Sequence, residues 1–127
     1  MIKLVTTLPL LMMVAGCTNF NEPEAVDPSP VVGCYFAPDA PSLSVQSNGV
    51  RIGESPAVLP LRYTQHKVGL ILEIPMVASV ENGEFDILSG DTHLYRVLMT
   101  DSGPIILVAA YPDGTLLHYK RHSQNPC

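Results

Sequence analysis

The chain has no tryptophan, and its aromatic content is only 6%. A hydrophobic core must therefore rest on Leu, Ile and Val, which suffice for one domain and not for two. Positive charge is also scarce, because seven Lys and Arg residues stand against twelve Asp and Glu residues and give a net charge of −5. An acidic balance of this kind repels polyanions, so nucleic acid is not expected as a partner.

Motifs that carry catalysis or metal binding are also missing. The sequence has no Cys-x-x-Cys or His-Glu-x-x-His spacing, so we expect no metal ion. Residues 53–57 resemble a nucleophile elbow only superficially, since Pro56 and Ala57 break the pattern. Asp91 and His93 acting with a distant serine are a combination that arises by chance in chains of this size. We therefore expect no enzyme activity and no cofactor.

The first residues form a short apolar segment that ends at a cysteine. Lys3 supplies a positive charge, residues 4–15 are almost wholly apolar, and the small residues Ala15 and Gly16 precede Cys17. The apolar run is too short to span a membrane as a helix, which needs about 20 residues. A charged tip, a short apolar body and small residues before a cleavage site are typical of a secretory signal.

The tetrapeptide Val14-Ala15-Gly16-Cys17 resembles the lipobox of bacterial lipoproteins. The resemblance implies that residues 1–16 are removed and that Cys17 becomes the lipidated first residue, with its nucleophilic sulfur linked to diacylglycerol and its amine acylated. Two or more acyl chains hold a protein firmly, at about 0.8 kcal/mol per buried methylene. Thr18 after the cysteine favours the outer membrane, facing the periplasm. The alternative is an ordinary secretory signal in which Cys17 is incidental.

Two other cysteines, Cys34 and Cys127, complete the set of three. With Cys17 committed to the anchor, an exported chain in an oxidising compartment is expected to join the remaining two in a disulfide. In the chain-entropy model a loop of that size stabilises the fold by about 4 to 5 kcal/mol. Reduced thiols or intermolecular pairing are the alternatives.

Residues 17–30 are the expected linker between the anchor and a β-domain over residues 31–127. From residue 18 onward the linker carries three prolines and three carboxylates, a composition that cannot bury enough apolar area to order itself. Extended proline-rich chain of about 3.1 Å per residue would hold the domain up to about 40 Å from the bilayer. Without Lys3 the net charge becomes −6, from six basic and twelve acidic residues. Membrane attachment is therefore expected from the lipid and not from charge.

Turn signals divide residues 31–127 into short segments. Asn48-Gly49 and Asn82-Gly83 suit type I′ hairpin turns, and Pro112-Asp113-Gly114 suits a longer hairpin turn. Ser89-Gly90-Asp91 is a further break in the chain. No window of helical length shows an uninterrupted apolar stripe of helical period. We expect an all-β domain, a small antiparallel meander of about eight to ten short strands that forms a barrel or a sandwich.

Most of these segments alternate as half-buried strands do. Val68, Leu70, Leu72 and Ile74 share one face of a predicted strand. Residues 104–111 are the exception, because their sequence PIILVAAY is apolar on both faces. This segment is expected in the middle of the sheet or, alternatively, against a partner chain.

A basic cluster lies near the end of this acidic chain, at His118, Lys120, Arg121 and His122. The cluster would suit an anionic partner such as a glycan or a lipid headgroup, and histidine gains charge on acidification below about pH 6.5. The alternative is a solvated terminal strand with no binding role.

These observations favour a cell-envelope lipoprotein whose β-domain binds or attaches without catalysis. Its expected partners are the membrane, through the lipid anchor, and an envelope protein or glycan. The plan of lipobox, compact barrel and disulfide between an early and a late cysteine is similar to that of the small periplasmic lysozyme inhibitors, although their Ser-Gly-x-x-Tyr loop has no clear counterpart here. An inhibitor of a cell-wall-degrading enzyme is therefore the alternative, followed by a carrier of a small apolar ligand.

Overall fold

The structure is a computed structural model that describes residues 27–127. The predicted signal peptide, the lipidation site Cys17 and most of the linker lie outside the described residues and stay predictions. The described part contains nine strands and no helix, which confirms the all-β prediction. Residues 27–127 accordingly offer no helix that could cross a membrane.

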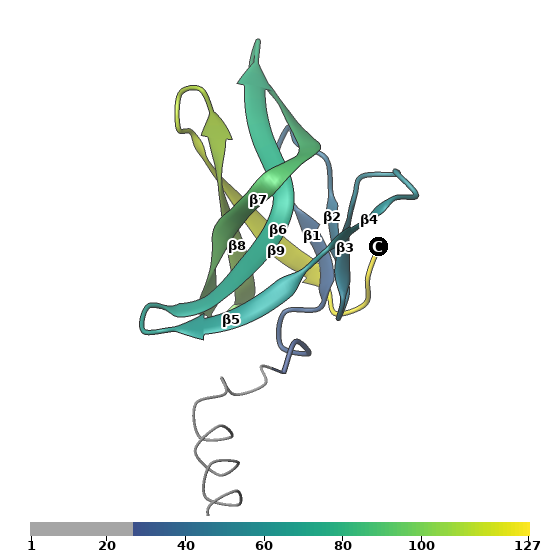
Figure 1. Cartoon of the computed structure of the whole chain (residues 1–127), viewed down its shortest axis with the longest axis vertical. Coiled ribbons are helices and arrows are strands. Elements are labelled where there is room, and N and C mark those ends of the chain that lie inside the picture. The colour runs from purple at the N-terminus through teal and green to yellow at the C-terminus, as the bar shows by residue number, and fades with distance from the viewer. Residues whose placement is uncertain (1–26) are drawn as a thin grey trace, which may run out of the picture.

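The nine strands form a single sheet that is nearly closed into a barrel (Figure 1). Their order across the sheet is β4-β3-β2-β1-β9-β8-β7-β6-β5. The edge strands β4 and β5 follow each other in the chain with only Leu61 between them, so the backbone itself joins the two edges. The strands are β1 (Gly33–Phe36), β2 (Leu43–Val45), β3 (Gly49–Ile52), β4 (Val58–Pro60), β5 (Arg62–His66), β6 (Gly69–Glu81), β7 (Glu84–Thr100), β8 (Gly103–Tyr111) and β9 (Leu116–Ser123).

The core is the barrel interior, which is filled by the inward side chains of the alternating strands. In β6 the predicted alternation holds for Leu72 and Ile74 and continues to Met76 and Ala78, all of which are buried, but it is wrong for Val68, which lies in the turn before the strand and is 60% exposed. Tyrosine compensates for the missing tryptophan, and four tyrosine hydroxyls donate hydrogen bonds to backbone carbonyls inside or beside the core. These bonds run from Tyr35 to Val31 (2.6 Å), Tyr63 to Gln46 (2.8 Å), Tyr119 to Pro41 (2.9 Å) and Tyr95 to Met76.

A disulfide joins Cys34 of β1 to Cys127 across a sequence separation of 93, and it brings the two Cα atoms to within 4.8 Å of each other. This distance between the Cα atoms lies within the usual range for bridged cysteines. The backbone N–H of Cys127 also donates to the hydroxyl of Ser44 at 3.1 Å. The end of the chain is thereby held against β1 and β2.

The two predicted Asn-Gly turns have different outcomes. Asn82 and Gly83 both have positive φ, 54° and 80°, as a type I′ turn requires. The type I′ turn predicted at Asn48-Gly49 is wrong, because neither residue has positive φ. Gly49 is required there for a different reason: a Cβ atom at this position would overlap the side chain of Val58 on β4.

The break predicted at Ser89-Gly90-Asp91 is instead a point where β7 bends and continues. Ile74 of β6 pairs with His93, but Met76 pairs with Ser89, so β7 has two extra residues at this bulge. Figure 1 shows β7 passing across β6 here. A Cβ atom on Gly90 would lie 3.1 Å from Cγ2 of Val77, so glycine permits the close crossing.

The crossing also separates β7 from β8. Their antiparallel ladder ends at the pair Val97–Ile106, and beyond it Ala110 of β8 pairs in parallel with Ala78 of β6. The wall of the barrel is therefore interrupted between residues 93–96 of β7 and residues 107–111 of β8.

Candidate functional site

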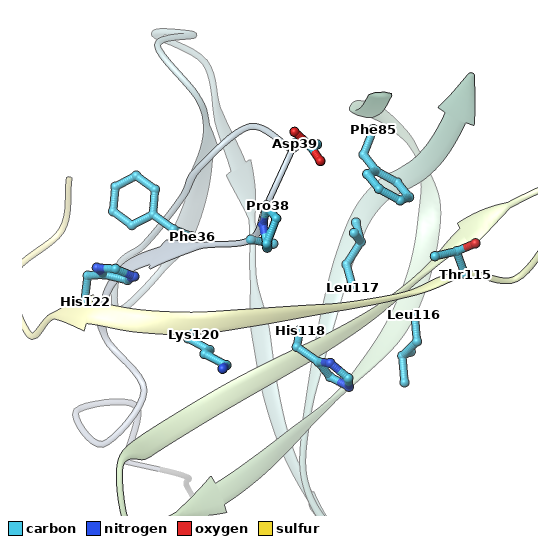
Figure 2. A pocket seen from close by; sticks show the side chains of 11 residues that line it. Phe36, Pro38, Asp39, Phe85, Thr115, Leu116, Leu117, His118, Lys120 and His122 are labelled. Carbon is cyan, nitrogen blue, oxygen red and sulfur yellow. The ribbon is translucent and has the colours of Figure 1, made fainter. Parts of the chain in front are cut away.

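A groove of about 620 Å³ runs along the outward face of β9 and is called the β9 groove here (Figure 2). Side chains on β9 alternate, so Leu116, His118, Lys120 and His122 point outward whereas Leu117 and Tyr119 are buried. The opposite wall comes from the end of β1 and the loop after it, and from the start of β7. The lining residues used below are Phe36, Pro38, Asp39, Phe85, Leu117, His118, Lys120 and His122.

The predicted basic cluster is divided by the strand. His118, Lys120 and His122 line the β9 groove, but Arg121 lies on the other face. Its guanidinium donates to the carbonyl oxygens of Pro30, at 2.8 Å, and Val32, at 3.3 Å. Arg121 therefore holds the segment that leads into β1 and is not part of the groove.

Two aromatic rings mark the ends of the β9 groove (Figure 2). Phe36, which is 45% exposed, meets the ring of His122 edge to face with the centroids 4.9 Å apart. Phe85 lies at the other end, where its backbone N–H donates to the carbonyl oxygen of Asp39 at 3.0 Å. This bond links the start of β7 to the β1–β2 loop and fixes the width of the groove.

The groove is less acidic than the chain as a whole, because Lys120 balances the charge of Asp39 and no other lining residue is formally charged when histidine is neutral. Asp39 is the only carboxylate among the lining residues, and Figure 2 shows it on the opposite side of the β9 ribbon from the side chains of His118 and Lys120. Lys120 offers three N–H donors and each histidine at least one, and these groups can bind an anionic ligand. His118 and His122 stand about 13 Å apart along the strand. Within residues 27–127 no three potential ligand side chains are grouped to hold a metal ion.

A second groove of about 620 Å³ lies where β7 and β8 separate and is called the β7–β8 groove. Leu94, Arg96, Leu107 and Tyr111 line it, and Leu116 borders both grooves. Strand β8 forms one side of this groove, and the alternative that it meets a partner chain stays a prediction. The strand is central in the sheet, as expected, yet its outward residue Tyr111 is 74% exposed.

Asp91 and His93 are both exposed beside the bend in β7, and His93 lines the β7–β8 groove. The two cysteines of the disulfide lie outside both sets of lining residues and act on the fold.

Sequence reasoning missed the aromatic and apolar part of the site. Phe36 and Phe85 come from strands far apart in the sequence, and no local pattern indicates that they line one groove. The alternation of β9 was the available signal, since it places His118 and His122 on one face and Arg121 on the other. Comparison of the chain with family models, curated proteins and solved structures finds no match in any of the three.

Proposed function

We propose that this chain is a lipid-anchored protein of the bacterial cell envelope whose β-domain binds an anionic partner without catalysis. The observation that carries the proposal is the β9 groove. In a chain with a net charge of −5, one groove gathers His118, Lys120 and His122 between two aromatic rings. Lys120 supplies positive charge for an anionic partner, and the N–H groups of the two histidines supply further hydrogen-bond donors.

The partner that suits the groove best is an extended acidic segment of another envelope protein. The outward residues Leu116 to His122 cover about 20 Å of strand, the length of about six extended residues. Phe36 and Pro38 offer exposed apolar surface in the groove. A glycan fits less well, because its hydroxyl groups need acceptors and Asp39 is the only carboxylate among the lining residues described.

The proposed location rests on the lipobox resemblance, and the Cys34–Cys127 disulfide supports it. Disulfides persist in oxidising compartments such as the periplasm. We assign the anchor to Cys17 and the domain to the periplasmic side of the outer membrane. Cells grown with radiolabelled palmitate should label the native chain and not the Cys17→Ser variant. Equal labelling of the two would contradict the anchor.

The groove is tested with a defined probe, a capped eight-residue peptide of alternating Glu and Leu. We expect amide NMR shifts to change along β9 and at Phe36 and Phe85. Lys120→Glu should raise the dissociation constant of the peptide about tenfold, a loss of affinity that corresponds to one charge-assisted hydrogen bond. Lys67→Glu, an equal charge change in the β5–β6 turn, is the matched control. Binding that is insensitive to Lys120→Glu, or as strong with a Lys-Leu peptide, would contradict the proposal.

A second candidate is an inhibitor of a cell-wall-degrading enzyme, and the β6–β7 hairpin favours it. Its tip projects beyond the neighbouring strands in Figure 1, and Glu81 and Glu84 flank the exposed turn. A protruding acidic turn suits a cationic cleft. Inhibition of lysozyme by the native chain that disappears in the double variant Glu81→Gln, Glu84→Gln would establish this function. An apolar-ligand carrier is not proposed, because Tyr35, Met76 and Tyr119 occupy the barrel interior.

A further inference from the structure

The outward surface of β7, β8 and β9 is apolar where strands of a water-facing barrel are normally polar. The ladders place its members side by side, with Leu98 opposite Ile105 and Ala109 opposite Leu116. Leu94 is 63% exposed, Leu116 48% and Tyr111 74%. We call this surface the β8 face; its apolar members are Leu94, Leu98, Ile105, Leu107, Ala109, Tyr111 and Leu116.

Every charged or protonatable side chain at an outward position of the β8 face is basic. Arg96 lies between Leu94 and Leu98 on β7, and the ladder of β8 and β9 sets His118 opposite Leu107 and Lys120 opposite Ile105. Carboxylates border the face: Glu73 of β6 pairs with Leu94 and its carboxylate lies 3.8 Å from Nε of Arg62, Asp91 lies at the bend of β7, and Asp101 and Asp113 lie in the turns at the two ends of β8. The Asp113 carboxylate already accepts hydrogen bonds from the backbone N–H and the hydroxyl of Thr115.

We propose that the β8 face docks on an anionic phospholipid surface. Lipid phosphates need only donors and positive charge, which Arg96 and Lys120 supply. The acyl boundary accepts apolar side chains, and a tyrosine such as Tyr111, apolar in its ring and polar at its hydroxyl, is favoured at that depth. A second copy of the chain is a poorer occupant, because a symmetric contact would bring two cationic surfaces together. A protein partner is also a poorer occupant, because its surface carries hydrogen-bond donors as well as acceptors and would need both kinds of group on the β8 face.

Charge segregation makes this docking compatible with an acidic chain. The net charge describes the whole surface, whereas screening confines the interaction to charges within about 10 Å of the lipid phosphates. This inference rests on the proposed anchor only for keeping the domain close to a bilayer. Two weak membrane contacts hold a protein far better than either alone. Lys120 belongs to both the β9 groove and the β8 face, so an acidic segment in the groove and a lipid surface on the face would compete for it.

The absence of tryptophan allows a position-specific test in the full native chain. Tryptophan is introduced at one of two exposed leucines, as Leu94→Trp on the β8 face or Leu88→Trp in the first half of β7. Leu88 is 55% exposed and is the matched control. Each protein is mixed with vesicles of equal parts phosphatidylglycerol and phosphatidylcholine that carry brominated acyl chains. We expect a blue shift and quenching in Leu94→Trp only; equal quenching in both variants would overturn the inference.

Charge is tested in the Leu94→Trp background. Arg96→Glu should lower the vesicle association constant about fivefold or more, the change that corresponds to about 1 kcal/mol per basic residue. Lys67→Glu should leave it unchanged, and vesicles of phosphatidylcholine alone should give little quenching. Quenching that is indifferent to both Arg96→Glu and headgroup charge would also overturn the inference.

The same comparison separates this inference from the proposed anchor. In the Cys17→Ser chain, position-specific quenching by phosphatidylglycerol vesicles should persist at lower occupancy. If the native chain purified from cells carries no acyl groups at Cys17 but its Leu94→Trp variant shows this quenching, the anchor is contradicted and docking of the β8 face is supported. If the native chain is acylated at Cys17 but Leu94→Trp and Leu88→Trp are quenched equally, the anchor is supported and docking of the β8 face is contradicted. Self-association that is abolished by Leu94→Glu, with no vesicle binding, would identify the face as a contact between copies.

Discussion

Phe36 and His122 meet edge to face at one end of the β9 groove, with their ring planes at 77°. The contact depends on the pairing of β1 with β9, which is offset by a bulge between Cys34 and Tyr35. An edge-to-face pair contributes about 0.5 to 1.5 kcal/mol beyond its buried area. Here the pair also shapes the surface that the proposed partner would meet.

Phe36→Ala should therefore affect binding more than folding. Because the ring is half-exposed, we expect the free energy of unfolding to fall by about 1 kcal/mol, measured by urea denaturation. Affinity for the Glu-Leu peptide should fall at least as much, since one wall of the groove is removed. Val58→Ala, at an exposed position on β4, is the control for a nonspecific effect. Equal peptide affinity in Phe36→Ala and the native chain would exclude Phe36 from the site.

The sequence predicts local features well where a residue type is selected for one local property, such as the tolerance of Asn-Gly for positive φ. Asn82-Gly83 suits positive φ and forms the expected turn. Alternation along β9 predicts which side chains share a face, and it would have assigned Arg121 to the opposite face. Asn48-Gly49 shows the limit, because Gly49 is required by the close approach of Val58, a contact that the local sequence does not reveal.

Long-range relationships are the part that the sequence could not supply. Phe85 lies beside the β1–β2 loop, where its backbone N–H donates to the carbonyl oxygen of Asp39, a residue 46 positions earlier in the chain. The β7–β8 groove exists because β7 crosses β6 at Gly90, where the local pattern indicated a turn. Both features depend on how the sheet closes. The pattern of one sequence predicts the strands but does not decide between a barrel and a sandwich.

Loss of the disulfide should destabilise the domain strongly. The bond between Cys34 and Cys127 closes a loop with a sequence separation of 93, for which the chain-entropy model gives about 4 to 5 kcal/mol. Urea denaturation of the Cys34→Ala, Cys127→Ala double variant should show this loss, and a reductant should lower the stability of the native chain but not of the variant. An unchanged urea midpoint under reducing conditions would contradict a structural role for the bond.

Alkaline pH should destabilise the barrel through its buried tyrosines. Burial raises the pKa of Tyr63 and of Tyr95 to about 12, from an ordinary value of 10.0. Burial raises the pKa of Tyr35 and Tyr119 as well. The unfolded chain then loses its phenolic protons at lower pH than the folded chain, so this stability is complete below about pH 10 and is lost as pH rises toward 12.

Urea midpoints measured from pH 8 to pH 11.5 check this dependence. The midpoint should be flat at the lower end and fall steeply above about pH 10, with the phenolate absorbance appearing together with unfolding. Tyr63→Phe should be less stable at neutral pH, because the carbonyl of Gln46 loses its donor, and should show a shallower alkaline fall. An alkaline slope that is the same in Tyr63→Phe and the native chain would contradict the assignment of this effect to Tyr63.

Gly90 and Val77 should be energetically coupled, because β7 crosses β6 at their contact. In Gly90→Ala the new Cβ would lie 3.1 Å from Cγ2 of Val77, and we expect a loss of about 1 to 2 kcal/mol in the free energy of unfolding. Val77→Ala removes the atom that is in the way. In that background Gly90→Ala should be neutral or stabilise by about 0.5 kcal/mol, since alanine restricts the unfolded chain. A double-mutant cycle by urea denaturation measures this coupling.

The same cycle bears on the β8 face, because the crossing separates β7 from β8 and exposes Leu94. Gly90→Ala should shift the amide NMR signals of residues 93–96 as well as those next to Val77, and Val77→Ala should partly restore them. Gly83→Ala, at a turn glycine with no atom near the added Cβ, is strained by its positive φ and should not couple to Val77. Additive effects of Gly90→Ala and Val77→Ala would mean that the two residues do not touch. The path of β7 across β6, and with it the opening between β7 and β8, would then be wrong.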